Sequence, residues 1–332
     1  MPNRTINIVK EPEEILKLLC IGINIPLWPE FHKYIIFDIK YFNAQSLVLA
    51  ENNAPAGHAL VFSSDKKILY FGFFGVLNDT KDRIEFLLEK LIEFATDKGF
   101  ETLRGPVNIP TIIFGWGFME EGSSTTLFAH KPVNSPLYPE IFRQKGFSEV
   151  LKEHSFEGVF SRVPPEFLEE NINNDYELIT FNSWKQIESI KIEFLELNAR
   201  NLPPTSVVTP SSAGVFENYL EFCKQYGDPS VWVFTRFKNT NELIGCFTTT
   251  PNPFDKKSFV LLTIVLDKKH RSMGLGWLMA DKLAANSLKK GINYCTTFVG
   301  THVSSSREMS KKMGLPLLRT HTIFSYSLQN NA

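Results

Sequence analysis

The two halves of this chain present the same order of predicted strands and helices, and this repeat constrains the fold more than any other feature. In each half a buried strand (residues 67–76 and 258–266) precedes an amphipathic helix that ends at a Lys-Gly pair. The glycines are Gly99 and Gly291, and glycine closes a helix in the left-handed conformation without a Cβ penalty. A further strand follows each helix. We therefore expect two units of similar architecture.

Each half then reaches a second helix end, at Gly146 and Gly314, and a closing strand (155–160 and 320–328). The two helix-ending glycines are 47 positions apart in the first half and 23 in the second. The first half therefore carries an insertion of about 24 residues, rich in Gly and Pro and placed at about 105–138. Four of its polar or aromatic residues could either form part of an acceptor pocket or only pack the interface between the halves: Asn108, Trp116, His130 and Tyr138.

The most polar connecting segment, 161–175, contains paired prolines and lies near the midpoint of the chain. It predicts a linker between a domain at 1–160 and a domain at 176–332. A chain beyond ~250–300 residues usually divides into domains in this way. In the second domain the pattern predicts these further elements: strand 176–181, helix 183–198, a Pro-rich connection at 202–206, helix 212–226, and strands 230–238 and 242–250.

This order of elements predicts an α/β (α+β) fold. Each domain should have a mixed, mostly antiparallel twisted sheet with helices on both faces. One parallel pair is expected where a strand, a helix and a strand follow one another.

Charge and composition exclude several classes of protein. Lys and Arg number 35 and Asp and Glu 36, so the basic excess typical of nucleic-acid binding is absent. No run of about 18 apolar residues predicts a membrane span, and the N-terminus lacks the apolar core of a signal peptide. Four scattered cysteines fit reduced thiols, and seven histidines form no metal-binding pattern. We expect a cytoplasmic protein without a metal, a membrane or a nucleic-acid partner.

The segment 266–276 is the most informative for chemistry, because it joins a buried strand to an amphipathic helix. A turn of this kind points backbone N–H groups outward at the positive end of the helix dipole. Gly274 and Gly276 leave room for a diphosphate, while Arg271 and His270 add donors. Short loops with glycines before helices are common, and most of them bind nothing.

The motif Arg271-x-x-Gly274-x-Gly276 resembles the acyl-CoA signature of the GNAT superfamily of N-acyltransferases, R/Q-x-x-G-x-G/A. Residues 264–266 lie where the fourth strand of that superfamily splays to admit the thioester arm, and residues 311–315 match its C-terminal motif. The resemblance covers about residues 175–328. The first half resembles the degenerate N-terminal copy of a tandem bacterial subgroup, through 103–108, 134–138 and 145–147. Its strand leads directly into its helix, so we expect one coenzyme site.

The resemblance implies acetyl-CoA or another acyl-CoA as co-substrate and a small-molecule or peptide amine as acceptor. The amine would attack the thioester directly in a ternary complex, and a backbone N–H near Leu266 would hold the oxyanion. The implied activity is that of an N-acetyltransferase. The residues expected to bind the coenzyme are Ile264, Val265, Leu266, Arg271, Ser272, Met273, Gly274, Leu275 and Gly276.

The catalytic groups implied by the resemblance are less complete. Many relatives place a tyrosine four residues before the last helix-ending glycine, where this chain has Ser310. His302 follows the strand beside the cleft and is a candidate base, although a histidine packed at the strand end or touching the coenzyme is the more ordinary interpretation. Asp267 is more typical of a solvated loop residue. Ser305 and Glu308 have the spacing of a capping box.

Three functions follow from these observations. The first is an acyltransferase that acts on an amine. The second is a non-catalytic acyl-CoA binder or sensor, which the missing tyrosine and the degenerate first half favour. The third is an aminoacyl-tRNA-dependent transferase, against which the missing basic patch and the intact loop at Arg271 both argue. The sequence does not indicate an oligomeric state.

Overall fold

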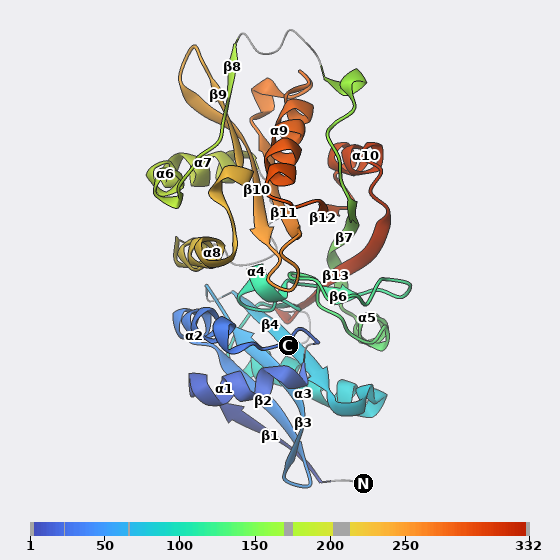
Figure 1. Ribbon diagram of the computed structural model, residues 1–332. Coiled ribbons are helices and arrows are strands. Elements are labelled where there is room, and N and C mark those ends of the chain that lie inside the picture. Colours follow the sequence, from blue (N-terminus) through green and yellow to red (C-terminus); the bar gives the residue numbers. More distant parts are fainter. Residues whose placement is uncertain (1–2, 23, 66, 169–174, 202–212, 330–332) are drawn as a thin grey trace. The chain divides into compact units, whose positions relative to one another are not determined.

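The computed structural model describes residues 3–22, 24–65, 67–168, 175–201 and 213–329. The chain divides into two compact units, each of mixed α/β architecture (Figure 1). The first unit comprises Met1–Glu153, Val208–Leu220 and Arg319–Ala332, and the second comprises His154–Val207 and Glu221–Leu318. The linear domain boundaries expected from the sequence, at 160 and 176, stay a prediction.

In the first unit the strand order is β1-β2-β3-β4-β5-β13, and β6 also pairs with β13. β4 and β5 form a parallel pair, at the strand–helix–strand crossover. Helix α3 buries one apolar stripe against the sheet, as its spacing of leucines requires. The strands are β1 (Arg4–Val9), β2 (Gln45–Glu51), β3 (Ala54–Phe62), β4 (Ile68–Val76), β5 (Thr102–Gly105), β6 (Phe118–Met119) and β13 (Leu317–Ser327). The helices are α1 (Pro12–Leu18), α2 (His32–Tyr41), α3 (Lys81–Asp97), α4 (Thr111–Phe114) and α5 (Leu137–Gln144).

In the second unit the strand order is β7-β12-β11-β10-β9-β8. Its strands are β7 (Ser148–Val159), β8 (Tyr176–Ile179), β9 (Val233–Phe237), β10 (Glu242–Pro251), β11 (Ser258–Leu266) and β12 (Tyr294–Gly300). Its helices are α6 (Trp184–Ser189), α7 (Lys191–Asn201), α9 (Leu275–Lys289) and α10 (Ser304–Lys312). Helix α8 (Ala213–Tyr226) belongs to this unit from Glu221 onward.

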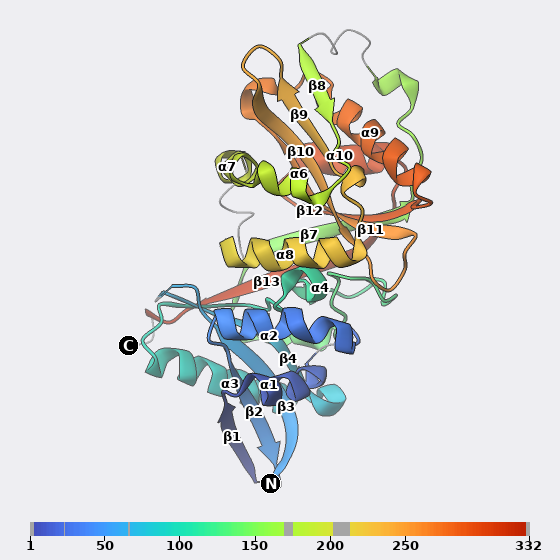
Figure 2. The same ribbon diagram turned by 60° about the vertical axis from the view of Figure 1, so that its left-hand side comes forward.

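Helices cover both faces of this second sheet (Figure 2). Met279 of α9 lies beside Gly245 of β10, whereas Phe194 of α7 contacts Phe234 of β9. Phe234 is paired with Cys246, the residue after Gly245, and successive residues of a strand face opposite sides. α9 and α7 therefore lie on opposite faces.

Most of the predicted elements are confirmed. β11 has the predicted bounds, and α9 ends before Gly291, which has a φ of +74°. β11 and β12 form the predicted parallel pair. In the described part of the chain, no helix is long and apolar enough to cross a membrane.

Three local expectations are wrong. The predicted helix 183–198 is two helices, α6 and α7, which are interrupted at Ile190 (φ −106°, ψ 12°). The predicted strand 230–238 begins as a 3-10 turn, because the Asp228 side chain accepts a hydrogen bond from the Ser230 N–H. No capping box forms at Ser305: α10 begins at Ser304 without a side-chain cap, and Glu308 instead lies 3.6 Å from Lys311. The Pro-rich connection 202–206 and residues 169–174 of the linker lie outside the described residues.

Candidate functional site

The parallel strands β11 and β12 pair over only part of their length. Their register runs from Ser258↔Tyr294 to Leu261↔Thr297, although β11 continues to Leu266 and β12 to Gly300. Residues 261–264 are only half-buried, in a strand that is flanked by neighbours on both sides in the sheet order. The two strands therefore diverge and leave a cleft at their carboxyl ends.

A β-bulge lies where the divergence begins. Thr248 of β10 pairs with Thr263 and Thr249 pairs with Leu261, so Leu262 is the extra residue on β11. In a regular strand Leu261 and Ile264 would face opposite sides of the sheet. With one extra residue between them, both line the same pocket.

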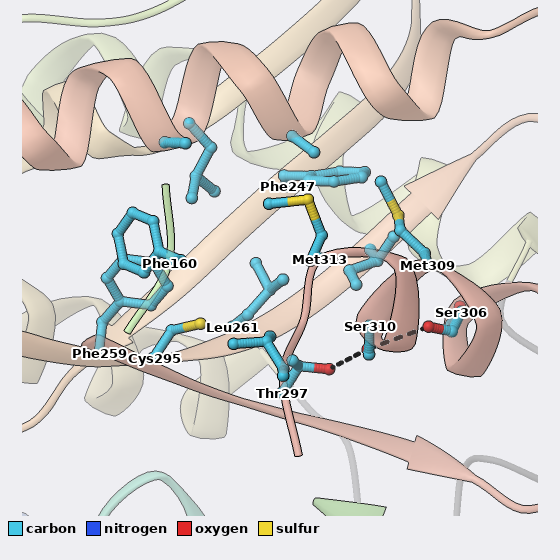
Figure 3. Close-up of a pocket in the computed structure, with 15 residues that line it drawn as sticks. Phe160, Phe247, Phe259, Leu261, Cys295, Thr297, Ser306, Met309, Ser310 and Met313 are labelled. Carbon is cyan, nitrogen blue, oxygen red and sulfur yellow. Dashed lines mark hydrogen bonds between the residues drawn. The ribbon is translucent and has the colours of Figure 1, made fainter. Parts of the chain in front are cut away.

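That pocket lies between the sheet and the helices α9 and α10 (Figure 3). Its cavity volume is about 60 Å³, and its walls come from β10, β11, β12, α9, α10 and Phe160. Nearly all of the lining is apolar. The hydroxyl groups among the lining residues belong to Thr297, Ser306 and Ser310.

Ser310, the residue at the position of the expected tyrosine, is one of these lining residues and is 5% exposed. Its Oγ donates a hydrogen bond to the Ser306 carbonyl at 3.0 Å and lies 3.4 Å from Thr297 Oγ1. The first bond is the i→i−4 bond that a serine commonly makes inside a helix. The Ser310 proton is therefore directed at the backbone of α10.

The loop between β11 and α9 is exposed at Arg271, Ser272 and Met273. The Arg271 Nε donates to the Leu266 carbonyl at 2.9 Å, so the arginine is anchored to the end of β11 while its side chain remains exposed. Ser272 and Gly274 have φ values of +63° and +74°, and this left-handed backbone turns the chain into α9.

The start of α9 has open space and no side-chain cap. A Cβ built on Gly276 would meet nothing within 4 Å, and Gly274 makes no side-chain cap hydrogen bond. The first N–H groups of an α-helix have no intrahelical acceptor, and the helix dipole adds positive potential there. This turn has the geometry and the electrostatics of an anion site.

The other residues predicted to bind the coenzyme lie on β11 before this turn and at the start of α9 after it. Ile264 lines the pocket, and Val265 is buried and pairs with Cys246. Leu266 supplies the carbonyl that holds Arg271. Leu275 is 1% exposed and is therefore buried.

The candidate bases are placed differently. His302 is exposed, in the turn between β12 and α10, and is not among the residues that line the pocket. The Asp267 carboxylate accepts a hydrogen bond from the Lys269 N–H at 3.0 Å. Burial would raise the pKa of Asp267, but the hydrogen bonds from Lys269 and Asn201 outweigh burial and lower it. Asp267 therefore stabilises the loop as an anion.

The sequence analysis missed a set of buried hydroxyls on the other face of the same sheet. Thr250 pairs with Val260 and Val260 with Thr296, so all three share the face opposite Phe259 and Cys295, which line the pocket. Within the described structure, the buried hydroxyls without a hydrogen-bond partner include those of Thr248, Thr250 and Thr296. Only strand register reveals that they share a face.

The first unit fills its own equivalent cleft. β4 and β5 pair only from Ile68↔Thr102 to Tyr70↔Arg104. Beyond this point Val107 N–H donates to the Phe71 carbonyl at 2.7 Å, and Asn108 Oδ1 accepts from Phe73 N–H at 2.6 Å. A Cβ on Gly72 would lie 1.9 Å from the Val107 carbonyl oxygen. The segment after β5 thus occupies the space between the strands.

The other residues of the insertion also make contacts within the first unit. The Tyr138 hydroxyl accepts from Val76 N–H at 3.0 Å and donates to Asp79 at 2.5 Å, beside the start of α3. Trp116 Nε1 donates to Glu153 at 2.7 Å. The ring of His130 lies 4.3 Å from that of Trp116, and burial holds its pKa well below the usual value. These contacts give Asn108, Trp116, His130 and Tyr138 structural roles, and a role in acceptor binding stays a prediction.

No group of three or more His, Cys, Asp or Glu side chains that could hold a metal ion occurs among the described residues.

Comparison with known proteins is informative at the level of the fold. The model of the acetyltransferase (GNAT) family matches residues 194–315. One similar structure is a tandem GNAT protein from the clavulanic acid biosynthesis pathway. The match covers 98% of this chain and 99% of that one, with a TM-score of 0.64 and 11% identity. A GCN5-related N-acetyltransferase from Sphaerobacter thermophilus matches 97% of this chain and 96% of its own, with a TM-score of 0.59 and 12% identity.

A third similar structure is the GCN5-related glucosamine N-acetyltransferase region of a fungal multi-domain GH3 beta-N-acetylglucosaminidase. It matches with a TM-score of 0.66 and 12% identity, over 98% of this chain and 38% of that one. Comparison with curated proteins gives no match. At these identities the structures establish the fold, and the function must be argued from the site. Residues 194–315 therefore match the acetyltransferase (GNAT) family, and the chain as a whole has the fold of a tandem GNAT protein.

Proposed function

We propose that this protein transfers an acyl group from an acyl-CoA to the amine of a small molecule or peptide, by direct attack in a ternary complex. The observation that carries the proposal is the continuity of three features in the second unit. The exposed turn at Arg271 follows β11, β11 diverges from β12, and the divergence begins at Leu261 and Thr297 on the wall of the pocket. An elongated molecule with an anionic group near one end fits this order.

The residues present fit the coenzyme. Its diphosphate would be held by the N–H groups at the start of α9 and by the Arg271 guanidinium. Beyond Leu261 the edge of β11 has no ladder partner in β12, so its N–H and C=O groups are available to the amides of the pantetheine arm. When bound, the coenzyme supplies an activated acyl carbon as a thioester. We propose one coenzyme site per chain, because the first unit fills its own cleft.

The acceptor would approach from the face that carries the hydroxyls of Thr248, Thr250 and Thr296. Buried hydroxyls without partners are costly, and a polar ligand would satisfy them. The amine nitrogen forms a bond to the acyl carbon, the C–S bond breaks, and one amine proton is lost to a base. Placing the two reactants together would supply most of the rate enhancement.

His302 is the proposed base, because an imidazole nitrogen can accept a proton from an amine and this one lies in the turn after β12. His302→Ala should lower turnover at pH 7 by at least about tenfold. His302→Gln, which keeps a polar side chain, should not restore it. Unchanged turnover in both variants, with the same pH profile as the wild type, would exclude this role.

A second candidate function is a non-catalytic acyl-CoA sensor, and the environment of Ser310 favours it. An aliphatic hydroxyl is a poor acid, and this one is directed at the Ser306 carbonyl. Release of free thiol from acyl-CoA in the presence of a panel of amines distinguishes the two functions. Binding without thiol release on any amine would favour the sensor.

The coenzyme site itself is tested by Arg271→Glu, measured by titration calorimetry with CoA. We expect binding to be lost with little change in melting temperature, since the side chain is exposed. Lys289→Glu makes the same charge change at the other end of α9 and should leave CoA affinity unchanged. Equal affinity of both variants and the wild type would remove the proposed site.

A cytoplasmic location also stays a prediction, to be checked by cell fractionation.

A further inference from the structure

The pocket in the second unit is polar at one end and apolar at the other. In Figure 3 Thr297, Ser306 and Ser310 lie at one end, while Phe160, Phe259 and Cys295 lie at the other. The polar end coincides with the last paired row of the strands, Leu261↔Thr297, where the cleft begins. The apolar end lies at the row Phe259↔Cys295, where the strands are still paired.

The apolar end is built from buried groups that offer a ligand no hydrogen bond. Phe160, Phe259 and Cys295 are each at most 5% exposed, and burial raises the pKa of the Cys295 thiol to about 12. Leu283, Ala284 and Leu315 also line the pocket. A cavity lined in this way stays dry and takes apolar groups.

We propose that the donor of this enzyme carries a medium-length hydrocarbon chain, of the butyryl to octanoyl class, whose tail lies in this pocket. The inference rests on the proposed acyl-CoA site and goes beyond it by naming the donor. The thioester would lie at the cleft near Thr297, and the chain would run towards Phe259.

The dimensions agree with a chain of this length. The rows Leu261↔Thr297 and Phe259↔Cys295 are two residues apart along the strands, which is roughly 7 Å at ~3.3 Å per residue. A water needs ~10–15 Å³ of such a cavity, so a volume of about 60 Å³ has room for about four to six groups of that size. An acetyl group would leave the apolar end empty, and a palmitoyl chain would exceed the cavity.

The first test is calorimetry of the full chain with CoA, acetyl-CoA, hexanoyl-CoA and palmitoyl-CoA. Each buried methylene contributes about fourfold in Kd, so hexanoyl-CoA should bind at least about tenfold more tightly than acetyl-CoA. Palmitoyl-CoA should show no further gain over hexanoyl-CoA. Equal affinity for acetyl-CoA and hexanoyl-CoA would overturn the inference and leave the proposed function intact, whereas failure to bind CoA at all would overturn both.

Two alanines of α9 provide a matched pair of variants. Ala284 lines the pocket, whereas its neighbour Ala285 is not among the lining residues. Ala284→Leu should fill the cavity and abolish the advantage of hexanoyl-CoA over acetyl-CoA. Ala285→Leu should keep that advantage. If both variants keep it, the chain does not enter the pocket.

Methyl NMR of the methionines keeps the proposal testable even if Ala284→Leu fails to fold. Met273 lies in the coenzyme turn, Met309 and Met313 line the pocket, and Met119 belongs to the first unit and serves as a reference. CoA should shift Met273 alone, and hexanoyl-CoA should also shift Met309 and Met313. A shift of Met273 by both ligands, with Met309 and Met313 unmoved, would overturn the inference while supporting the coenzyme site.

Discussion

At the scale of single residues, two neighbouring threonines of β12 have opposite environments. Thr297 lines the pocket and its hydroxyl lies 3.4 Å from that of Ser310. Thr296 faces the other side, is fully buried, and its hydroxyl has no hydrogen-bond partner among the described residues. A buried hydroxyl without a partner costs free energy, so Thr296 is better explained by ligand binding than by stability.

Thr296→Val should therefore increase the free energy of unfolding by ~1 kcal/mol, because a methyl group replaces an unsatisfied hydroxyl. Thr297→Val should leave the free energy of unfolding unchanged or lower it, since the Thr297 hydroxyl lies 3.4 Å from that of Ser310. Urea denaturation of both variants measures the difference. A Thr296→Val protein that is less stable than Thr297→Val would contradict the assignment of this face to a ligand.

Asp38 gives the first unit a specific pH dependence. Burial raises the pKa of its carboxyl from 3.8 to about 7, although the Asn218 side chain donates to it at 2.7 Å. The folded state therefore holds a proton that the unfolded state releases between these values. The stability from this group is fully present below pH 3.8 and is lost as the pH rises to about 7.

Asp38→Asn keeps the shape of the side chain and its acceptor oxygen. Because asparagine does not ionise, the variant should not lose stability as the pH rises. The variant should match the wild type near pH 4 and exceed its free energy of unfolding by about 2 to 4 kcal/mol near pH 8. Denaturation curves at both pH values measure the difference. The same gain at pH 4 and pH 8 would show that protonation of Asp38 is not its cause.

The sequence allowed us to select candidate residues within one loop. It did not allow us to predict which residues meet across neighbouring strands. Arg271, Gly274 and Gly276 were singled out because their spacing is local, and their role in coenzyme binding stays a prediction. Thr296 and Thr297 were missed, because their roles depend on the register with β11 and on which face of the sheet each occupies. Sequence spacing gave no sign that Tyr138 would donate a hydrogen bond to Asp79, 59 positions away.

At the scale of elements, a pattern is reliable where its ends are marked. β11 and α9 were predicted closely, since a continuous apolar run precedes the loop and Gly291 ends the helix. The helix expected at 183–198 was wrong because Ile187, Ile190, Phe194 and Leu197 keep a helical spacing across the break. No glycine or proline marks the interruption at Ile190.

At the start of α9, one substitution should affect stability and CoA binding in opposite directions. A Cβ built at Gly276 would meet no atom within 4 Å, and leucine has a higher helix propensity than glycine. Gly276→Leu should therefore keep or raise the melting temperature and weaken CoA binding by at least about tenfold, because it fills the space above the helix N-terminus. Gly276→Ala, with a Cβ alone, should give a smaller loss. Full CoA affinity in the leucine variant would place the diphosphate elsewhere.

At the scale of the whole molecule, each unit is completed by chain from outside its own half of the sequence. β13 ends the chain, yet Arg319 onwards belongs to the first unit, where Phe324 pairs with Gly105 of β5. The domain boundaries expected from the sequence repeat stay a prediction, and both closing strands carry similar apolar patterns. Pairing between residues more than two hundred positions apart leaves no local signal, so it could not be predicted.

This composition of the units predicts where a C-terminal substitution acts. Phe324 is fully buried in the core of the first unit, and its ring lies 5.9 Å from that of Phe142. Phe324→Ala should cost about 3 to 5 kcal/mol and increase hydrogen exchange in β3 and β4. Leu315→Ala, only nine positions earlier, removes a core residue of the second unit and should increase exchange in β9 and β10 instead. Exchange mass spectrometry of both variants measures this contrast, and faster exchange in the same unit for both would show that the closing segment does not divide between the two cores.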